Sequence, residues 1–88
     1  YNSVKENVGD PQMTEKEFID IFAENLISIM QETGTTQREL AKDSHLTEAT
    51  ISRYLSRDRM VSSRALVNIA IALNCNLDDL VPLYDLVD

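Results

Sequence analysis

The sequence predicts an all-α protein, and three observations support this fold class. Apolar residues recur at steps of three and four positions, which places them along one side of a helix. Short polar residues that can cap a helix stand where these segments begin. Strand signals are weak, because the β-branched residues fall within the helical patterns and no two-residue hairpin turn occurs. The 88 residues are enough for one small domain, which we expect to be a compact helical bundle.

The first predicted helix runs from about Glu15 to Glu32. Thr14 and Glu17 have the spacing of a capping box, in which each side chain binds the backbone amide of the other residue. We expect an apolar stripe on this helix to face the core: Phe18, Ile19, Phe22, Leu26, Ile29 and Met30. Gly34 suits the left-handed conformation that ends a helix. Residues 1–12 lack periodicity, so we interpret them as a flexible tail or linker, with a docking arm as the alternative.

Residues 35–59 contain two short helical patterns separated by about four residues, which favours a tight, crossed pair. The first begins at Thr36, which forms a second capping box with Glu39. The second begins at Thr47, a good N-cap. One side of the second helix is apolar: Ile51, Tyr54 and Leu55. The other side shows mostly short side chains and an arginine: Glu48, Ala49, Ser52 and Arg53. Such a helix can pack on its neighbour and present its other side outward.

Two further helices are predicted after a loop at residues 56–63. Ser62 or Ser63 caps the first of them. Its predicted buried side consists of Leu66, Ile69, Ala70 and Leu73. Asn74 can take the left-handed conformation at its end, and Asn76 with Asp79 begins the last helix. We expect the last helix to close the core through Leu77, Leu80 and Val81. The apolar residues that follow can either seal the core or form a dimer contact: Leu83, Tyr84, Leu86 and Val87.

The net charge is −7, but the charges are unevenly distributed. Residues 34–64 carry six basic and four acidic side chains, a net +2. Residues 1–33 carry two basic and seven acidic side chains (−5), and residues 65–88 carry four acidic ones (−4). Lys and Arg supply most of the non-specific affinity for nucleic acid by neutralising phosphates. Any contact with nucleic acid is therefore expected at the central segment.

Several classes of function lack the residues that they need. The single cysteine, Cys75, excludes an internal disulfide, and no other Cys or His lies at metal-ligand spacing. We expect His45 to be a solvent-facing turn residue. No nucleophile with a base, carboxylate pair in a cleft or glycine-rich phosphate loop is discernible, so we expect no enzyme and no cofactor. Without a membrane span or a signal-peptide pattern, the expectation is a soluble, cytoplasmic protein.

The central pair carries a recognisable set of residues. They are Gln37, Leu40 and Ala41, then Leu46 and Thr47, then the run from Thr50 to Tyr54. With these residues the chain resembles the phage-repressor and Cro-like (lambda-repressor-like, XRE-type) helix-turn-helix domains. The resemblance covers about residues 18–83 and implies a compact five-helix bundle at residues 13–88, with the helix-turn-helix unit at about 36–55. The chain departs from the family where His45 replaces the usual turn glycine and Leu55-Ser56-Arg57 replaces Glu-x-Gly.

The resemblance implies sequence-specific binding of double-stranded DNA by a transcriptional regulator of the repressor type, with helix 47–55 in the major groove. The candidate base contacts are Thr47, Glu48, Ala49, Thr50, Ser52 and Arg53. The candidate phosphate contacts are Thr36, Gln37, Arg38, Arg57, Arg59 and Arg64. The family also implies a homodimer on a palindromic operator, with Leu83, Tyr84, Leu86 and Val87 as candidate dimer contacts. The alternative is a protein–protein interaction or antitoxin-like module that keeps the fold with weak or no DNA binding.

Overall fold

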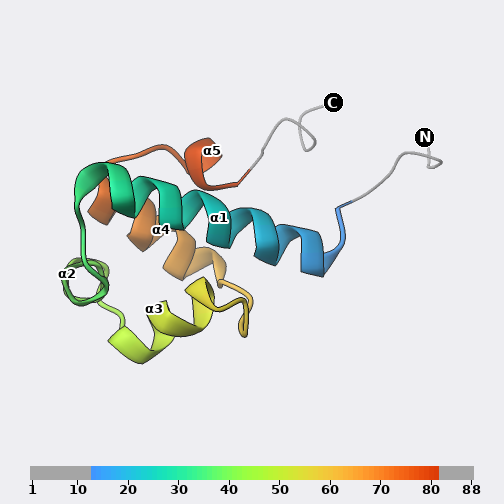
Figure 1. The fold of residues 1–88 in the computed structure, drawn as a ribbon, viewed down its shortest axis with the longest axis horizontal. Helices are drawn as coiled ribbons and strands as arrows, with labels where there is room; N and C mark the ends of the chain where they lie inside the picture. Colours follow the sequence, from blue (N-terminus) through green and yellow to red (C-terminus); the bar gives the residue numbers. More distant parts are fainter. Residues whose placement is uncertain (1–12, 82–88) are drawn as a thin grey trace.

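The computed structural model describes residues 13–81, which form five helices and no strand (Figure 1). The helices are α1 (Glu15–Thr33), α2 (Gln37–Asp43), α3 (Glu48–Leu55), α4 (Ser63–Leu73) and α5 (Leu77–Leu80). This architecture confirms the predicted all-α, five-helix fold class, and each helix begins where the sequence predicts a cap. The proposed tail at residues 1–12 and the apolar residues from Leu83 to Val87 lie outside the described residues.

The longest helix, α1, contacts α3, α4 and α5 (Figure 1). Its predicted capping box is present, because the Thr14 hydroxyl accepts the Glu17 N–H at 3.1 Å and the Glu17 carboxylate accepts the Thr14 N–H at 2.8 Å. Gly34 ends the helix with φ of 69°, as predicted. Nothing lies within 4 Å of a Cβ placed there, so the backbone conformation alone favours glycine. Both ends of α1 are therefore set by local chemistry.

The core combines side chains from all five helices. The largest fully buried apolar side chains are Phe22, Leu26, Leu40, Ile51, Ile69, Leu80 and Val81. Burying each such side chain contributes roughly 1.5–3 kcal/mol relative to leaving it exposed. Five residues that were expected to face the core are only half-buried: Phe18, Ile19, Ile29, Leu66 and Leu77. All of them except Ile19 pack against the edge of the core. On α4, Ala65 is buried together with Ile69, Ala70 and Leu73, which were predicted.

A side-chain hydrogen bond joins the first and last helices. The Asn25 side-chain amide on α1 donates to the Leu80 carbonyl at the end of α5, at 2.8 Å. A helix of four residues has too few internal hydrogen bonds to be stable alone. The bond to Asn25 and the burial of Leu80 and Val81 therefore hold α5 in place.

Candidate nucleic-acid interface

The helix-turn-helix unit consists of α2, a short turn and α3. His45 adopts φ of 60° in the turn, and the Leu46 N–H donates to the Ala41 carbonyl at 2.9 Å, which closes the end of α2. The His45 side chain is exposed, as predicted for a turn residue. Ser44 is fully buried, and its hydroxyl donates to the Leu40 carbonyl at 2.6 Å. Serine commonly bonds to a carbonyl four residues earlier in a helix, so this polar group is satisfied inside the core.

The inner side of α3 is anchored in the core. Ile51 is fully buried and Tyr54 is 4% exposed. The Tyr54 ring meets the Phe22 ring of α1 edge-on, with centroids 5.9 Å apart and an interplanar angle of 77°. Edge-to-face aromatic pairs of this kind contribute beyond their burial alone. Because α1 holds this side of α3, the opposite side must face outward.

The outer side of α3 carries most of the residues expected to read bases. Thr47, Glu48, Ala49, Ser52 and Arg53 are exposed. Thr50 is half-buried, and its N–H donates to the Thr47 hydroxyl at 3.1 Å. The hydroxyls of Thr47 and Thr50 also lie 2.9 Å apart, so both groups take part in capping α3. Within residues 13–81, Arg53 forms no ion pair.

The start of α2 is occupied by a carboxylate. The Thr36 hydroxyl accepts the Glu39 N–H at 3.1 Å, and the Glu39 carboxylate accepts the Thr36 N–H at 3.0 Å. The hydrogen bond from the Thr36 backbone, followed by that from its hydroxyl, lowers the pKa of Glu39 below its ordinary value. Gln37 and Arg38 follow in the first turn and are exposed. Thr36 therefore serves as the cap of α2, whereas the side chain of Arg38 is free to reach outward.

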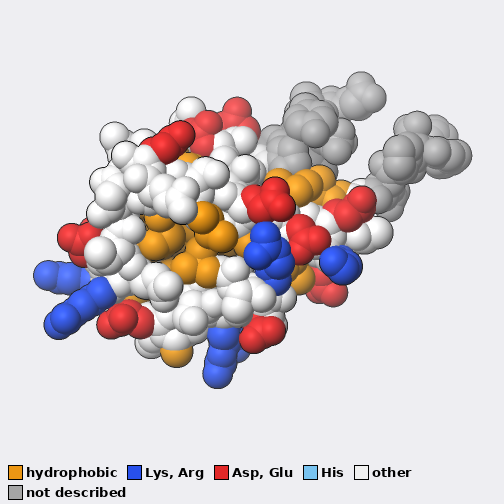
Figure 2. Space-filling model, in the orientation of Figure 1, with side chains coloured by type: hydrophobic (Ala, Val, Ile, Leu, Met, Phe, Trp, Pro, Cys, Tyr) orange, Lys and Arg blue, Asp and Glu red, His pale blue; other side chains and the backbone are white. Residues whose placement is uncertain are grey.

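Arg57 follows α3 and faces acidic residues of α1. Its Nε lies 3.1 Å from Asp20 Oδ1, and its Nη2 lies 3.8 Å from Glu24 Oε2. Figure 2 shows basic and acidic side chains gathered where this loop meets α1. Arg57 was expected to contact phosphate, and no partner within the chain was predicted for it. A usable signal was the four-residue spacing of Asp20 and Glu24, which puts both carboxylates on one side of α1.

Other basic side chains remain exposed around the helix-turn-helix unit. Arg38, Arg59 and Arg64 form no ion pair with any residue from 13 to 81. In Figure 2, basic side chains project beside α2 and below α3, while the edge over α1 and α5 shows acidic ones. These three unpaired arginines thus lie around α2, α3 and the start of α4, within the segment that the charge distribution predicts.

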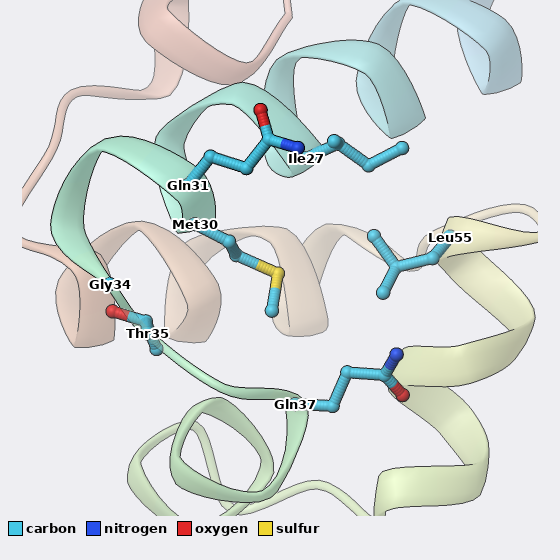
Figure 3. Close-up of a pocket in the computed structure, with 7 residues that line it drawn as sticks. All are labelled: Ile27, Met30, Gln31, Gly34, Thr35, Gln37 and Leu55. Atoms are coloured by element: carbon cyan, nitrogen blue, oxygen red, sulfur yellow. The ribbon is translucent and has the colours of Figure 1, made fainter.

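An open groove of about 340 Å³ lies between α1, the start of α2 and the end of α3 (Figure 3). Its apolar wall includes Ile27, Met30 and Leu55, and no charged residue lines it. The side chain of Gln37 extends from α2 toward Leu55 on α3 (Figure 3). The groove therefore contributes an apolar surface behind the helix-turn-helix unit, and the charged groups of the candidate interface lie elsewhere.

Three further observations concern residues 13–81. Cys75 is half-buried, and burial followed by the charge of Asp79 raises the pKa of its thiol, which lowers its reactivity. Within the described range, no group of three His, Cys, Asp or Glu side chains is placed to hold a metal ion. None of the helices there has the length and apolar character needed to cross a membrane.

Comparison with known proteins identifies the family. The sequence profile of the helix-turn-helix family matches residues 26–80, which extend from the middle of α1 to the end of α5. No curated protein and no solved structure matched the chain. Because the profile covers more than half of the 88 residues, the chain belongs to the helix-turn-helix family, of the XRE type. This agrees with the phage-repressor and Cro-like resemblance, and the general function of such domains is DNA binding in regulators.

Proposed function

We propose that this helix-turn-helix protein is a sequence-specific transcriptional regulator, of the repressor type, that inserts α3 into the major groove. The observation that carries the proposal is the orientation of α3. Ile51 and Tyr54 turn inward against α1, so that Ser52 and Arg53 project from the opposite, exposed side. In a helix-turn-helix the second helix enters the groove with its N-terminal residues at base edges.

The base contacts follow from the chemistry of the exposed side chains. Arg53 has no described ion-pair partner and can bind guanine O6 and N7 through two hydrogen bonds. Glu48 can accept from a cytosine amino group, and Ala49 can contact a thymine methyl. The hydroxyls of Thr47 and Thr50 are committed to the cap of α3. We therefore assign these two residues contacts with the bases through their methyl groups. Arg53 is therefore the main determinant of sequence.

The phosphate contacts come from the exposed residues that flank α3. We assign Gln37 and Arg38 to one strand of the backbone and Arg59 and Arg64 to the other. Contacts of this kind orient the protein on DNA without reading its sequence. Thr36 caps α2, and Arg57 is held by α1, so neither is assigned a direct contact. One such domain reads a short half-site, so we propose a homodimer on a palindrome whose half-sites lie about 34 Å apart.

Selection of bound sequences from a random duplex pool tests this function. We expect a palindromic sequence to be enriched, with a guanine at one position of each half-site. The variant Arg53→Ala should lose preference at that position only, because it removes one base contact. The matched control, Arg64→Ala, should weaken binding to all sequences equally. If no sequence were enriched, or if Arg53→Ala selected the same sequence as the wild type, the proposed function would be contradicted. The alternative, a protein–protein interaction module that retains the fold, would then be favoured.

A further inference from the structure

Asp20 and Glu24 of α1 hold Arg57, the second residue after the recognition helix α3. Asp20 is the centre of the group, because one carboxylate oxygen lies 3.1 Å from Arg57 and the other lies 3.3 Å from Lys16. Glu24 adds a second carboxylate 3.8 Å from the Arg57 guanidinium. Arg57 thus lies between two carboxylates that come from a helix more than thirty positions earlier in the sequence. We call Asp20 and Glu24 the acidic brace.

The backbone at Arg57 connects the brace to the recognition helix. Arg57 has φ of 69°, a left-handed conformation that glycine adopts without strain. Its N–H donates to the Tyr54 carbonyl at 3.2 Å, and the Asp58 N–H donates to the Arg53 carbonyl at 2.9 Å. The end of α3 is therefore closed by the residue that the brace holds. Arg57 therefore holds a position where the backbone favours glycine, and its guanidinium lies against α1.

We propose that the acidic brace positions Arg57 and withholds its charge from DNA phosphates, which sets the affinity and the salt dependence of binding. This inference rests on the proposed DNA binding. Arg57 lies in the same loop as Arg59, and Arg64 follows in the first turn of α4, so a released Arg57 is next to the proposed phosphate contacts. The three paired side chains are 36–71% exposed. Exposed ion pairs of this kind contribute little to folding stability, so neutralising the carboxylates should free Arg57 without unfolding the protein.

The double variant Asp20→Asn/Glu24→Gln tests the brace in a salt titration of DNA binding. Freeing one cation to reach a phosphate should steepen the slope of log K against log salt by about 0.9 and tighten binding about five- to tenfold at 0.1 M salt. The matched control is Glu15→Gln/Glu32→Gln, which removes two charges from exposed positions on the same helix. The control should tighten binding less and leave the slope nearly unchanged. A slope in the brace variant equal to that of the control would overturn the proposal.

A second background separates Arg57 from general repulsion between carboxylates and phosphates. In the Arg57→Gln background, neutralising the brace should change affinity and slope little more than the control does, because the Arg57 guanidinium is absent and only Lys16, on α1, loses its partner. A full effect of the brace variant in that background would also overturn the proposal. Circular dichroism of each variant shows whether the helical fold is retained.

Hydrogen exchange of the Arg57 Nε–H, followed by nuclear magnetic resonance without DNA, distinguishes failure of the brace from failure of the proposed function. We expect slow exchange in the wild type and in the control, and faster exchange when Asp20 and Glu24 are neutralised. Equal exchange in all three proteins would rule out the brace whatever the protein binds. If the wild type binds no duplex while exchange is slowed by the brace, the proposed function fails and the proposed effect on DNA fails with it.

Discussion

The outer surfaces of α1 and α3 differ in charge, although the two helices pack directly on each other. On α1, Asp20 and Glu24 are exposed or half-buried carboxylates that hold a cation from another part of the chain. On α3, Ser52 and Arg53 are exposed, and Arg53 has no ion-pair partner among the described residues. A net charge of −7 therefore says little about the surface proposed to meet DNA. What matters is which helix carries each charge and which way it faces.

The largest expected effect comes from removing the contact that gives α3 its orientation. Tyr54→Ala should lower the free energy of unfolding by about 3–5 kcal/mol, because it leaves a cavity beside Phe22. Chemical denaturation followed by circular dichroism measures this change. The control Tyr54→Phe keeps the ring and should cost far less. If Tyr54→Ala cost less than about 1 kcal/mol, the ring would not be what anchors α3 to α1.

The next effect concerns DNA binding by the outer side of α3. Arg53→Ala should weaken binding to the selected sequence by about 1–3 kcal/mol and remove the preference for guanine at one position. Measuring wild type and variant on both the selected and the base-substituted duplex gives a double-mutant cycle. Strong coupling is expected for Arg53 and none for Arg59→Ala. If Arg53 and Arg59 showed equal coupling to the substituted base, Arg53 would contact phosphate and not a base. The proposed difference between a residue that reads a base and one that only orients the protein would then be lost.

A smaller effect is expected at the turn between α2 and α3. His45 has φ of 60°, nearly the same as Gly34 at the end of α1. A side chain in this conformation costs about 1–2 kcal/mol, whereas glycine loses about 0.5–1 kcal/mol through its more flexible unfolded chain. His45→Gly should therefore stabilise the protein by up to about 1 kcal/mol, measured by thermal unfolding. Gly34→Ala is the reverse control and should destabilise; stabilisation there would contradict the backbone account.

The smallest effect concerns Glu39, one of four acidic side chains in the central segment, residues 34–64. The pKa of Glu39 is lowered in the folded protein from its ordinary value of 4.5. The ionised carboxylate therefore stabilises the fold, and this contribution is fully present at pH values above 4.5. That contribution is lost as the pH falls through the lowered pKa. Glu39→Gln should unfold at a slightly lower temperature than wild type at neutral pH, and the difference should disappear well below pH 4.5. A difference that persisted in acid would mean that packing, and not the charge, is responsible.

Local features of the fold could be predicted from the sequence, because they depend on neighbouring residues. The capping boxes at Thr14 and Thr36 and the left-handed residues Gly34 and Asn74 each need only a few adjacent positions, and all four are present. Periodicity likewise predicted that Ile51 and Tyr54 face inward. These predictions did not require knowledge of how the helices cross.

Contacts between distant parts of the chain could not be predicted in this way. The pairing of Arg57 with Asp20 and the bond from Asn25 to the Leu80 carbonyl depend on the angle at which helices pack, which periodicity does not specify. Sequence analysis therefore treated Arg57 as an ordinary phosphate contact. The burial of Ser44 depends on the same packing, although its bond to the preceding turn is local.

The bond between Asn25 and the Leu80 carbonyl limits how DNA specificity can be transplanted. Through this bond α1 supports α5, and through the contact of Phe22 with Tyr54 the same helix supports α3. A chimera that borrowed only residues 36–55 would leave both supports behind, and the grafted helix would have nothing to fix its angle. An engineered protein with a new sequence preference should therefore keep the whole of residues 15–81 as its scaffold, and only the outward-facing side chains of α3 should be changed.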